Sequence, residues 1–237
     1  MGTFTDPFSP ARQPGHPALT LSAGLSSGFP HLDRLLPGGG WPTGAVTEIL
    51  ARRGHVAPVG LLLPALAPLS WEGRWVAWIG GERPARGDLE EHGFDGSRVL
   101  TVRPRPGEDS LRLAERALVA GHCGAILVWL ERLERFAVSR LQQAARGSDT
   151  AVFLFCPPGA MAQPLAGELR VYVSTHSRRL AVEILACRGG AGSVLQLAGE
   201  ELADAGQLAP VSRPARGLPR TSRHPQKFTA HPELVGN

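Results

Sequence analysis

The chain has 237 residues, 43% of them apolar, and its 25 basic residues outnumber 21 acidic residues by four. This length and composition allow a sizeable core in one domain with appendages. The longest apolar run, residues 59–69, is too short for a bilayer, and residues 1–20 lack the apolar centre of a signal peptide, so we expect no membrane association. The three widely spaced cysteines fit neither a disulfide framework nor a zinc site, which predicts buried free thiols in a cytoplasmic protein without a bound metal.

The charge is unevenly distributed along the chain. Residues 210–237 hold five basic residues and one acidic residue, whereas the first 209 residues hold 20 of each. We therefore expect three parts: a flexible, proline-rich arm over residues 1–21, a folded domain over 22–205 and a basic, disordered tail over 206–237.

Strands and helices alternate along the predicted domain after a short helix at residues 30–36. Apolar, β-branched runs predict buried strands over residues 45–50, 75–79, 98–102, 125–130 and 150–156. The intervening segments predict helices over residues 61–69, 83–91, 109–120 and 133–146. In the first of these, Pro64 and Pro68 should kink the helix, or the helix should end before Pro68, because an interior proline removes a backbone hydrogen bond.

Two of these helices carry apolar side chains at spacings that predict a buried face. In the helix over 109–120 the predicted inward residues are Leu111, Ala114, Leu118 and Val119. In the helix over 133–146 they are Phe136, Ala137, Leu141 and Ala144.

The alternation of strands and helices predicts an α/β fold with a mostly parallel sheet and helices on both faces. After residue 158 the pattern changes. Residues 169–175 and 179–187 alternate polar and apolar side chains around a short turn, which predicts an antiparallel hairpin at the edge of the sheet. Residues 193–197 fit one further strand.

The entry to the predicted domain resembles that of the RecA-like recombinases, which implies a RecA-like three-layer fold over about residues 22–200. The resemblance is carried by Leu25-Ser26-Ser27-Gly28, by Gly38-Gly39-Gly40-Trp41-Pro42-Thr43-Gly44 and by Val46-Thr47-Glu48-Ile49. In that family a phosphate-binding loop with a lysine follows, because a lysine and the N–H groups at a helix start hold the nucleotide phosphates.

The corresponding loop of this chain lacks that chemistry. No Gly-Lys-Ser/Thr occurs, the position of the family's lysine falls near Ala57, and Lys227 is the only lysine of the chain. We interpret the loop as a vestigial nucleotide loop that binds no nucleotide cofactor, with its residues Arg52, Arg53, Gly54, His55 and Ala57. The alternative is an anion bound by the arginines and histidine at the helix start.

Two further positions can be compared with the family. Glu82 matches the catalytic glutamate that follows a strand in RecA, but the metal-binding aspartate of RecA falls near Trp129, and an indole cannot hold magnesium. Without lysine and aspartate, Glu82 has no partner with which to activate water. Trp129 either fills space left by the nucleotide or contacts a partner. We therefore expect no enzymatic activity, against the alternative of an active ATPase.

The pattern of a RecA-like domain without these catalytic groups resembles the ImuA family, with Val182-Glu183-Ile184-Leu185-Ala186-Cys187-Arg188-Gly189-Gly190 adding to the resemblance. It implies an accessory role in error-prone translesion DNA synthesis during the SOS response. The implied partners are an ImuB-like, polymerase-related protein, an error-prone DNA polymerase and RecA. The alternative is a SulA-like inhibitor of cell division that binds the tubulin-like protein FtsZ.

The basic tail is the remaining candidate for a binding site. A basic segment attracts DNA phosphates without reading sequence, and it can also dock on an acidic protein. A solubilising terminus without a partner is the alternative. The residues concerned are Arg213, Arg216, Arg220, Arg223, Lys227 and Phe228.

Overall fold

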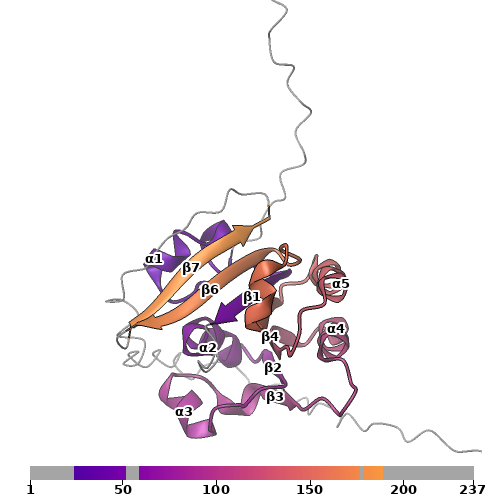
Figure 1. Cartoon of the computed structure of the whole chain (residues 1–237). Helices are drawn as coiled ribbons and strands as arrows, with labels where there is room; N and C mark the ends of the chain where they lie inside the picture. Colours follow the sequence, from indigo (N-terminus) through magenta and orange to yellow (C-terminus); the bar gives the residue numbers. More distant parts are fainter. Residues whose placement is uncertain (1–23, 52–58, 177–178, 189–237) are drawn as a thin grey trace, which may run out of the picture.

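The computed structural model describes residues 24–51, 59–176 and 179–188, and a seven-stranded sheet runs through them (Figure 1). The strand order is β3-β2-β4-β5-β1-β6-β7. All neighbours pair in parallel except β6 and β7, which pair antiparallel at the edge. The strands are β1 (Ala45–Ala51), β2 (Trp75–Ile79), β3 (Val99–Val102), β4 (Cys123–Trp129), β5 (Ala151–Cys156), β6 (Leu169–His176) and β7 (Arg179–Cys187).

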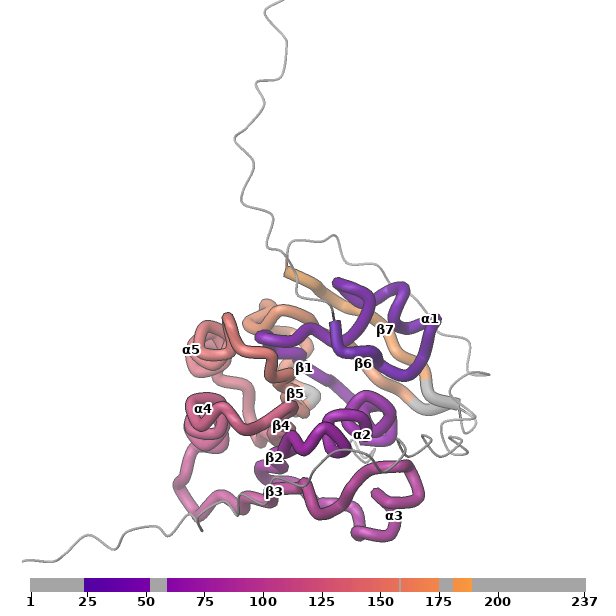
Figure 2. Tube along the Cα trace, turned by 180° about the vertical axis from the view of Figure 1, so that it is seen from behind, coloured from indigo at the N-terminus to yellow at the C-terminus, as the bar shows by residue number. Residues whose placement is uncertain are grey.

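Helices cover both faces of this sheet, which gives three layers. Helices α4 (Ser110–Ala120) and α5 (Arg135–Ala145) lie side by side on one face, as both views show (Figures 1 and 2). The other face carries α1 (Pro30–Asp33) and α2 (Leu63–Trp71), and α3 (Arg86–Glu91) lies near the β3 edge. The predicted α/β fold with a parallel sheet and an antiparallel edge hairpin is therefore confirmed.

The core divides into two apolar clusters, one on each face of the sheet. Strand residues alternate between them, because successive side chains point to opposite faces. Val76 and Trp78 of β2 join the cluster under α1 and α2, whereas Ala77 and Ile79 join the cluster under α4 and α5. The central strands are buried on both faces, which explains their continuous apolar runs.

Helix α2 differs from the prediction that Pro64 and Pro68 would kink or shorten it. The helix continues through Pro68 to Trp71. Pro64 lies in its first turn, where a missing N–H is tolerated, so Pro68 is the one interior proline. The helix is almost entirely buried against the sheet, and this apolar burial offsets the lost hydrogen bond.

The predicted inward faces of α4 and α5 are partly wrong. Val119 and Phe136 are 85% and 84% exposed, and Ala144 is exposed as well. The buried positions of α5 are Ala137, Val138, Leu141, Gln142 and Ala145. Gln142 replaces an apolar side chain in this face because its Oε1 accepts a hydrogen bond from the Val46 N–H at 2.7 Å. Hydrophobicity alone therefore assigned two large side chains to the wrong side.

The thiols follow the prediction for Cys123 and Cys156, which are free and buried, whereas Cys187 is half-buried. Residues 193–197 lie outside the described residues, as do the whole predicted arm and the whole basic tail. The boundaries proposed for the arm, domain and tail therefore stay predictions. None of the described helices is long and apolar enough to cross a membrane.

Candidate functional site

The C-terminal ends of β2, β4 and β5 carry a stack of three aromatic rings. Trp129, the last residue of β4, lies between Trp78 and Phe155. The ring centroids of Trp129 and Trp78 are 4.8 Å apart with planes at 26°, and those of Trp129 and Phe155 are 4.3 Å apart with planes at 22°. All three belong to the face of the sheet that α2 covers. The position expected from the sequence to match the metal-binding aspartate of RecA thus holds a packed indole ring.

Gly81 closes the stack from the segment that follows β2. Its backbone adopts a left-handed φ of +62°, and a Cβ added there would lie 2.4 Å from Cδ2 of Trp129. A side chain at this position would collide with the indole, so glycine is required both by the backbone angle and by the close approach. The loop after β2 and the ring at the end of β4 therefore fit only together.

The sequence-predicted site is only partly brought together. Glu82 is exposed beside Gly81 and makes no hydrogen bond or ion pair with another residue that the structure describes. Trp129 belongs to the aromatic stack. The residues of the predicted vestigial loop, Arg52, Arg53, Gly54, His55 and Ala57, lie outside the described residues, and so do the tail residues from Arg213 to Phe228.

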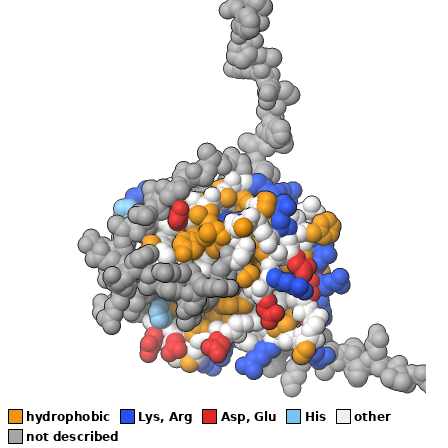
Figure 3. Space-filling model, viewed as in Figure 1, with side chains coloured by type: hydrophobic (Ala, Val, Ile, Leu, Met, Phe, Trp, Pro, Cys, Tyr) orange, Lys and Arg blue, Asp and Glu red, His pale blue; other side chains and the backbone are white. Residues whose placement is uncertain are grey.

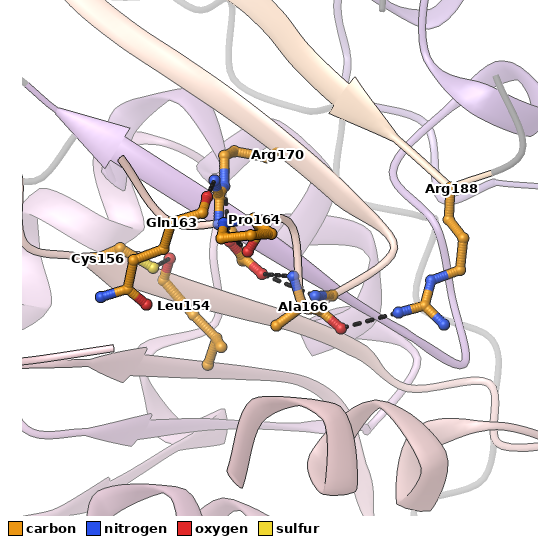
Figure 4. A network of polar contacts seen from close by, with 9 residues as sticks. Leu154, Cys156, Gln163, Pro164, Ala166, Arg170 and Arg188 are labelled. Atoms are coloured by element: carbon orange, nitrogen blue, oxygen red, sulfur yellow. Dashed lines mark hydrogen bonds and ion pairs between the residues drawn. The ribbon is translucent and has the colours of Figure 1, made fainter. Parts of the chain in front are cut away.

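A buried ion pair on the opposite face of the sheet was not predicted. Glu48 of β1 and Arg170 of β6 are register partners on neighbouring strands, and both are buried. Figure 4 shows Arg170 within the network of polar contacts. Arg170 donates Nε and Nη2 to Oε2 of Glu48, the Nε bond measuring 2.7 Å. Oε1 accepts the backbone N–H groups of Ala166 and Gly167 at 2.9 and 2.7 Å. Both carboxylate oxygens are thus satisfied, as a buried charge requires.

The same network organises the connection between β5 and β6. Arg170 also donates to the carbonyl oxygens of Gln163 and Pro164, which follow the 3-10 turn η4 (Pro158–Ala162). Nη2 of Arg188 donates to the Ala166 carbonyl at 3.1 Å, which ties the end of β7 to the same segment. The Glu48 carboxylate therefore links β1 to the segment between β5 and β6 and to the edge hairpin of β6 and β7.

Burial controls the titratable groups around this network. Burial raises the pKa of the Cys156 thiol, and the Glu48 carboxylate adds to this effect by disfavouring a second negative charge nearby. Burial also raises the pKa of the Glu168 carboxyl, although the Arg188 guanidinium nearby acts to lower it. A thiol held neutral is a poor nucleophile, so this cluster has a structural rather than a chemical character.

Metal-binding groups are not assembled in the part of the chain that the structure describes. No group of three histidine, cysteine, aspartate or glutamate side chains there could hold a metal ion.

The Glu48–Arg170 ion pair had one signal in the sequence. Each of its two residues is a charged residue in the middle of an apolar strand, and such a charge needs a partner when it is buried.

Solved structures support the fold independently. The KaiC-like protein PH0186 from Pyrococcus horikoshii OT3 superposes with a TM-score of 0.54 at 16% sequence identity, over 73% of this chain and 92% of the other. At this identity the similarity concerns the fold, which is RecA- and KaiC-like.

Similarity in sequence extends to bacterial cell division inhibitors. SulA of Yersinia enterocolitica is 28% identical over 116 residues, 48% of this chain and 69% of that protein. SulA of Serratia proteamaculans is 26% identical over 119 residues, 50% of this chain and 71% of that protein. The model of the MT3502 N-terminal domain family matches residues 34–163, more than half of the chain. The chain belongs to the MT3502 N-terminal domain family.

Proposed function

We propose that this protein is a non-catalytic, RecA-like accessory protein of SOS-induced, error-prone translesion DNA synthesis. It acts through contacts with an ImuB-like, polymerase-related protein, an error-prone DNA polymerase and RecA, and its basic tail adds non-specific attraction to DNA. The similarity to SulA and the RecA-like fold support the SOS-related part of this proposal. The ImuA-like sequence pattern supports the translesion part.

The observation that carries the non-catalytic part is the aromatic stack around Trp129. In a RecA-like ATPase the ends of these strands surround the metal and the γ-phosphate. Here the rings of Trp78, Trp129 and Phe155 lie in contact at that edge, closed by Gly81. Tryptophan offers an N–H donor and no oxygen ligand for magnesium. A stack of aromatic rings in which Trp78 and Phe155 are buried supports structural stability better than phosphate chemistry.

Nucleotide binding is tested by titrating the full chain with a fluorescent ATP analogue and magnesium. We expect no saturable binding below about 1 mM, where binding corresponds to about 4 kcal/mol. RecA measured in the same buffer is the positive control. Micromolar binding, or ATP hydrolysis that the Glu82→Gln substitution abolishes, would contradict the non-catalytic part.

The translesion role is tested in the organism that encodes the protein. Deleting the gene should lower the damage-induced mutation frequency, and the wild-type gene should restore it. Because Glu82 has no described partner, the Glu82→Gln variant at normal protein level should restore the frequency as well. An unchanged frequency in the deletion strain would contradict the translesion role.

A SulA-like inhibitor is the second candidate, and the sequence similarity to SulA favours it. This candidate predicts that the purified protein lowers FtsZ polymerisation at stoichiometric concentration and that its induction blocks division. The translesion proposal predicts neither effect. The effects on FtsZ polymerisation and on cell division therefore separate the SulA-like candidate from the translesion proposal.

A further inference from the structure

The surface of α3 is acidic. Asp88, Glu90 and Glu91 of this six-residue helix are all exposed, and its only basic residue, Arg86, is paired with Glu90 at 2.7 Å. Asp88 and Glu91 make no ion pair with a residue that the structure describes. Figure 3 shows acidic side chains, in red, in the region where Figure 1 places α3. The unpaired charge of this surface is therefore negative.

The solvent side of α4 and α5 has the opposite charge. With their cap residues included, the two helices carry five arginines, Arg112, Arg116, Arg135, Arg140 and Arg146, against Asp109, Glu115 and Glu134, a net charge of 5 − 3 = +2. Arg112 is paired with Asp109 at 3.9 Å. Glu115 is already paired, because its Oε1 accepts a hydrogen bond from Nε of Arg140 at 2.7 Å. Arg116 is exposed and has no ion pair within the described region. We call this surface the α4–α5 face.

The α4–α5 face also exposes two large apolar side chains. Phe136 of α5 and Val119 of α4 are 84% and 85% exposed, more than Trp71, Leu100 and Met161, the remaining exposed large hydrophobics among the described residues. Phe136 lies one turn before Arg140, and Val119 lies one turn after Glu115. These apolar side chains therefore flank the Glu115–Arg140 ion pair that joins the two helices. An exposed aromatic ring beside arginines has the composition of the centre of a protein interface.

The two surfaces lie on different sides of the molecule, so one molecule cannot join them itself (Figures 1 and 3). We propose that the α4–α5 face of one copy binds the α3 face of a second copy. This contact uses two different surfaces and is heterologous, which leaves one face of each type free at the ends of an assembly. The proposal goes beyond the proposed function and stands on charge complementarity and on the exposure of Phe136 and Val119.

The charged residues and the apolar residues of the proposed contact have different physical roles. Exposed charges of opposite sign mainly accelerate association and set the orientation, and salt weakens their effect. Removing Phe136 from water supplies the apolar part, which salt does not screen. Self-association should therefore weaken as the salt concentration rises, and it should depend on both the exposed charges and the burial of Phe136.

The test is sedimentation velocity of the full chain as a function of concentration, at about 50 mM and about 500 mM salt, where the screening length falls from about 14 to about 4 Å. We expect concentration-dependent association at low salt that weakens at high salt. Phe136→Ser should weaken the association at least about tenfold. Arg34→Glu, a charge reversal of an exposed residue beside α1, is the matched control and should associate as the wild type does.

Charge reversal identifies the two faces. Arg112→Glu with Arg116→Glu, and separately Asp88→Arg with Glu91→Arg, should each leave the protein monomeric. Mixed together, the two double variants should associate again, because the native α3 face of one meets the native α4–α5 face of the other, and the two reversed faces also carry opposite charges. Circular dichroism of each variant, compared with the wild type, checks that the fold is retained.

Three outcomes would overturn the proposal. The first is a wild type that stays monomeric at low salt. The second is self-association that the α3 variant loses and the α4–α5 variant retains, which would assign α3 to the chain's own basic tail. The third is a mixture of the two folded double variants that stays monomeric.

Discussion

Glu48 and Arg170 face each other across neighbouring parallel strands, and each satisfies the other's charge in the interior of the sheet. The side chain of Glu48 is fully buried and that of Arg170 is 5% exposed. Removing one partner leaves the other charged and buried, which costs more than the pair contributes when intact.

Arg170→Ala should lower the free energy of unfolding by about 3–5 kcal/mol, because Glu48 loses its guanidinium while it stays buried. Urea denaturation monitored by circular dichroism measures the change. The control is Arg86→Ala, which breaks the exposed Arg86–Glu90 pair and should leave the midpoint near that of the wild type. Combining Glu48→Leu with Arg170→Met should recover part of the loss. A double variant less stable than Arg170→Ala would contradict the explanation.

Gly81→Ala should destabilise the protein more than Gly73→Ala does. Both residues have a left-handed backbone, with φ of +62° and +81°, so both substitutions incur conformational strain of about 1–2 kcal/mol. Only at Gly81 does the added Cβ also collide with the Trp129 ring, whereas no atom lies within 4 Å at Gly73. Overpacking adds about 1–3 kcal/mol. Equal urea midpoints for the two variants would show that the loop moves away from the ring without cost.

Trp129→Asp should destabilise the protein without creating nucleotide binding. The substitution removes two ring contacts and places a carboxylate beside Trp78 and Phe155, at a cost of about 2–4 kcal/mol. Trp129→Phe keeps an aromatic ring and should lower the free energy of unfolding by less than Trp129→Asp does. The measurements are urea denaturation and the titration with the fluorescent ATP analogue. Magnesium-dependent ATP binding by the aspartate variant would show that the nucleotide site is intact apart from this residue.

Stability should fall as the pH rises from about 8 to 10, partly because of Cys156. The folded protein holds this thiol protonated since its pKa is raised, whereas the unfolded chain deprotonates near the ordinary thiol pKa of about 8.5. The unfolded state therefore binds fewer protons above this pH, and the free energy of unfolding decreases. Cys156→Ala should reduce the dependence. The pH dependence is measured as the change in the urea midpoint between pH 7.5 and pH 9.5. An identical decrease in the wild type and in Cys156→Ala would assign the loss of stability to other titratable groups.

The accuracy of the sequence predictions varied with how local each signal is. The α4 helix was predicted closely, because Asp109 caps its start through the Leu111 N–H and Gly121 ends it in a left-handed conformation. The strand positions followed from continuous apolar runs. Phe136 was misplaced because hydrophobicity does not tell whether a side chain at the first turn of a helix meets the sheet or the solvent.

Long-range features escaped the sequence altogether. Glu48 and Arg170 are 122 residues apart, and only the sheet order places β1 beside β6. The contact between Gly81 and Trp129 depends in the same way on β2 lying next to β4. The sequence placed Trp129 near the end of a strand, but the identity of its neighbours required the fold.

The aromatic stack also gives the protein an internal optical reporter. Two indole rings with centroids 4.8 Å apart and planes inclined by 26° are close enough for their electronic transitions to couple. Such coupling gives a circular dichroism signal in the ultraviolet that vanishes when either ring turns away. Because Trp78 and Trp129 end neighbouring strands, this signal reports the alignment of β2 and β4 without an added label, and a partner that displaced either ring would be visible from the light absorbed by the protein itself.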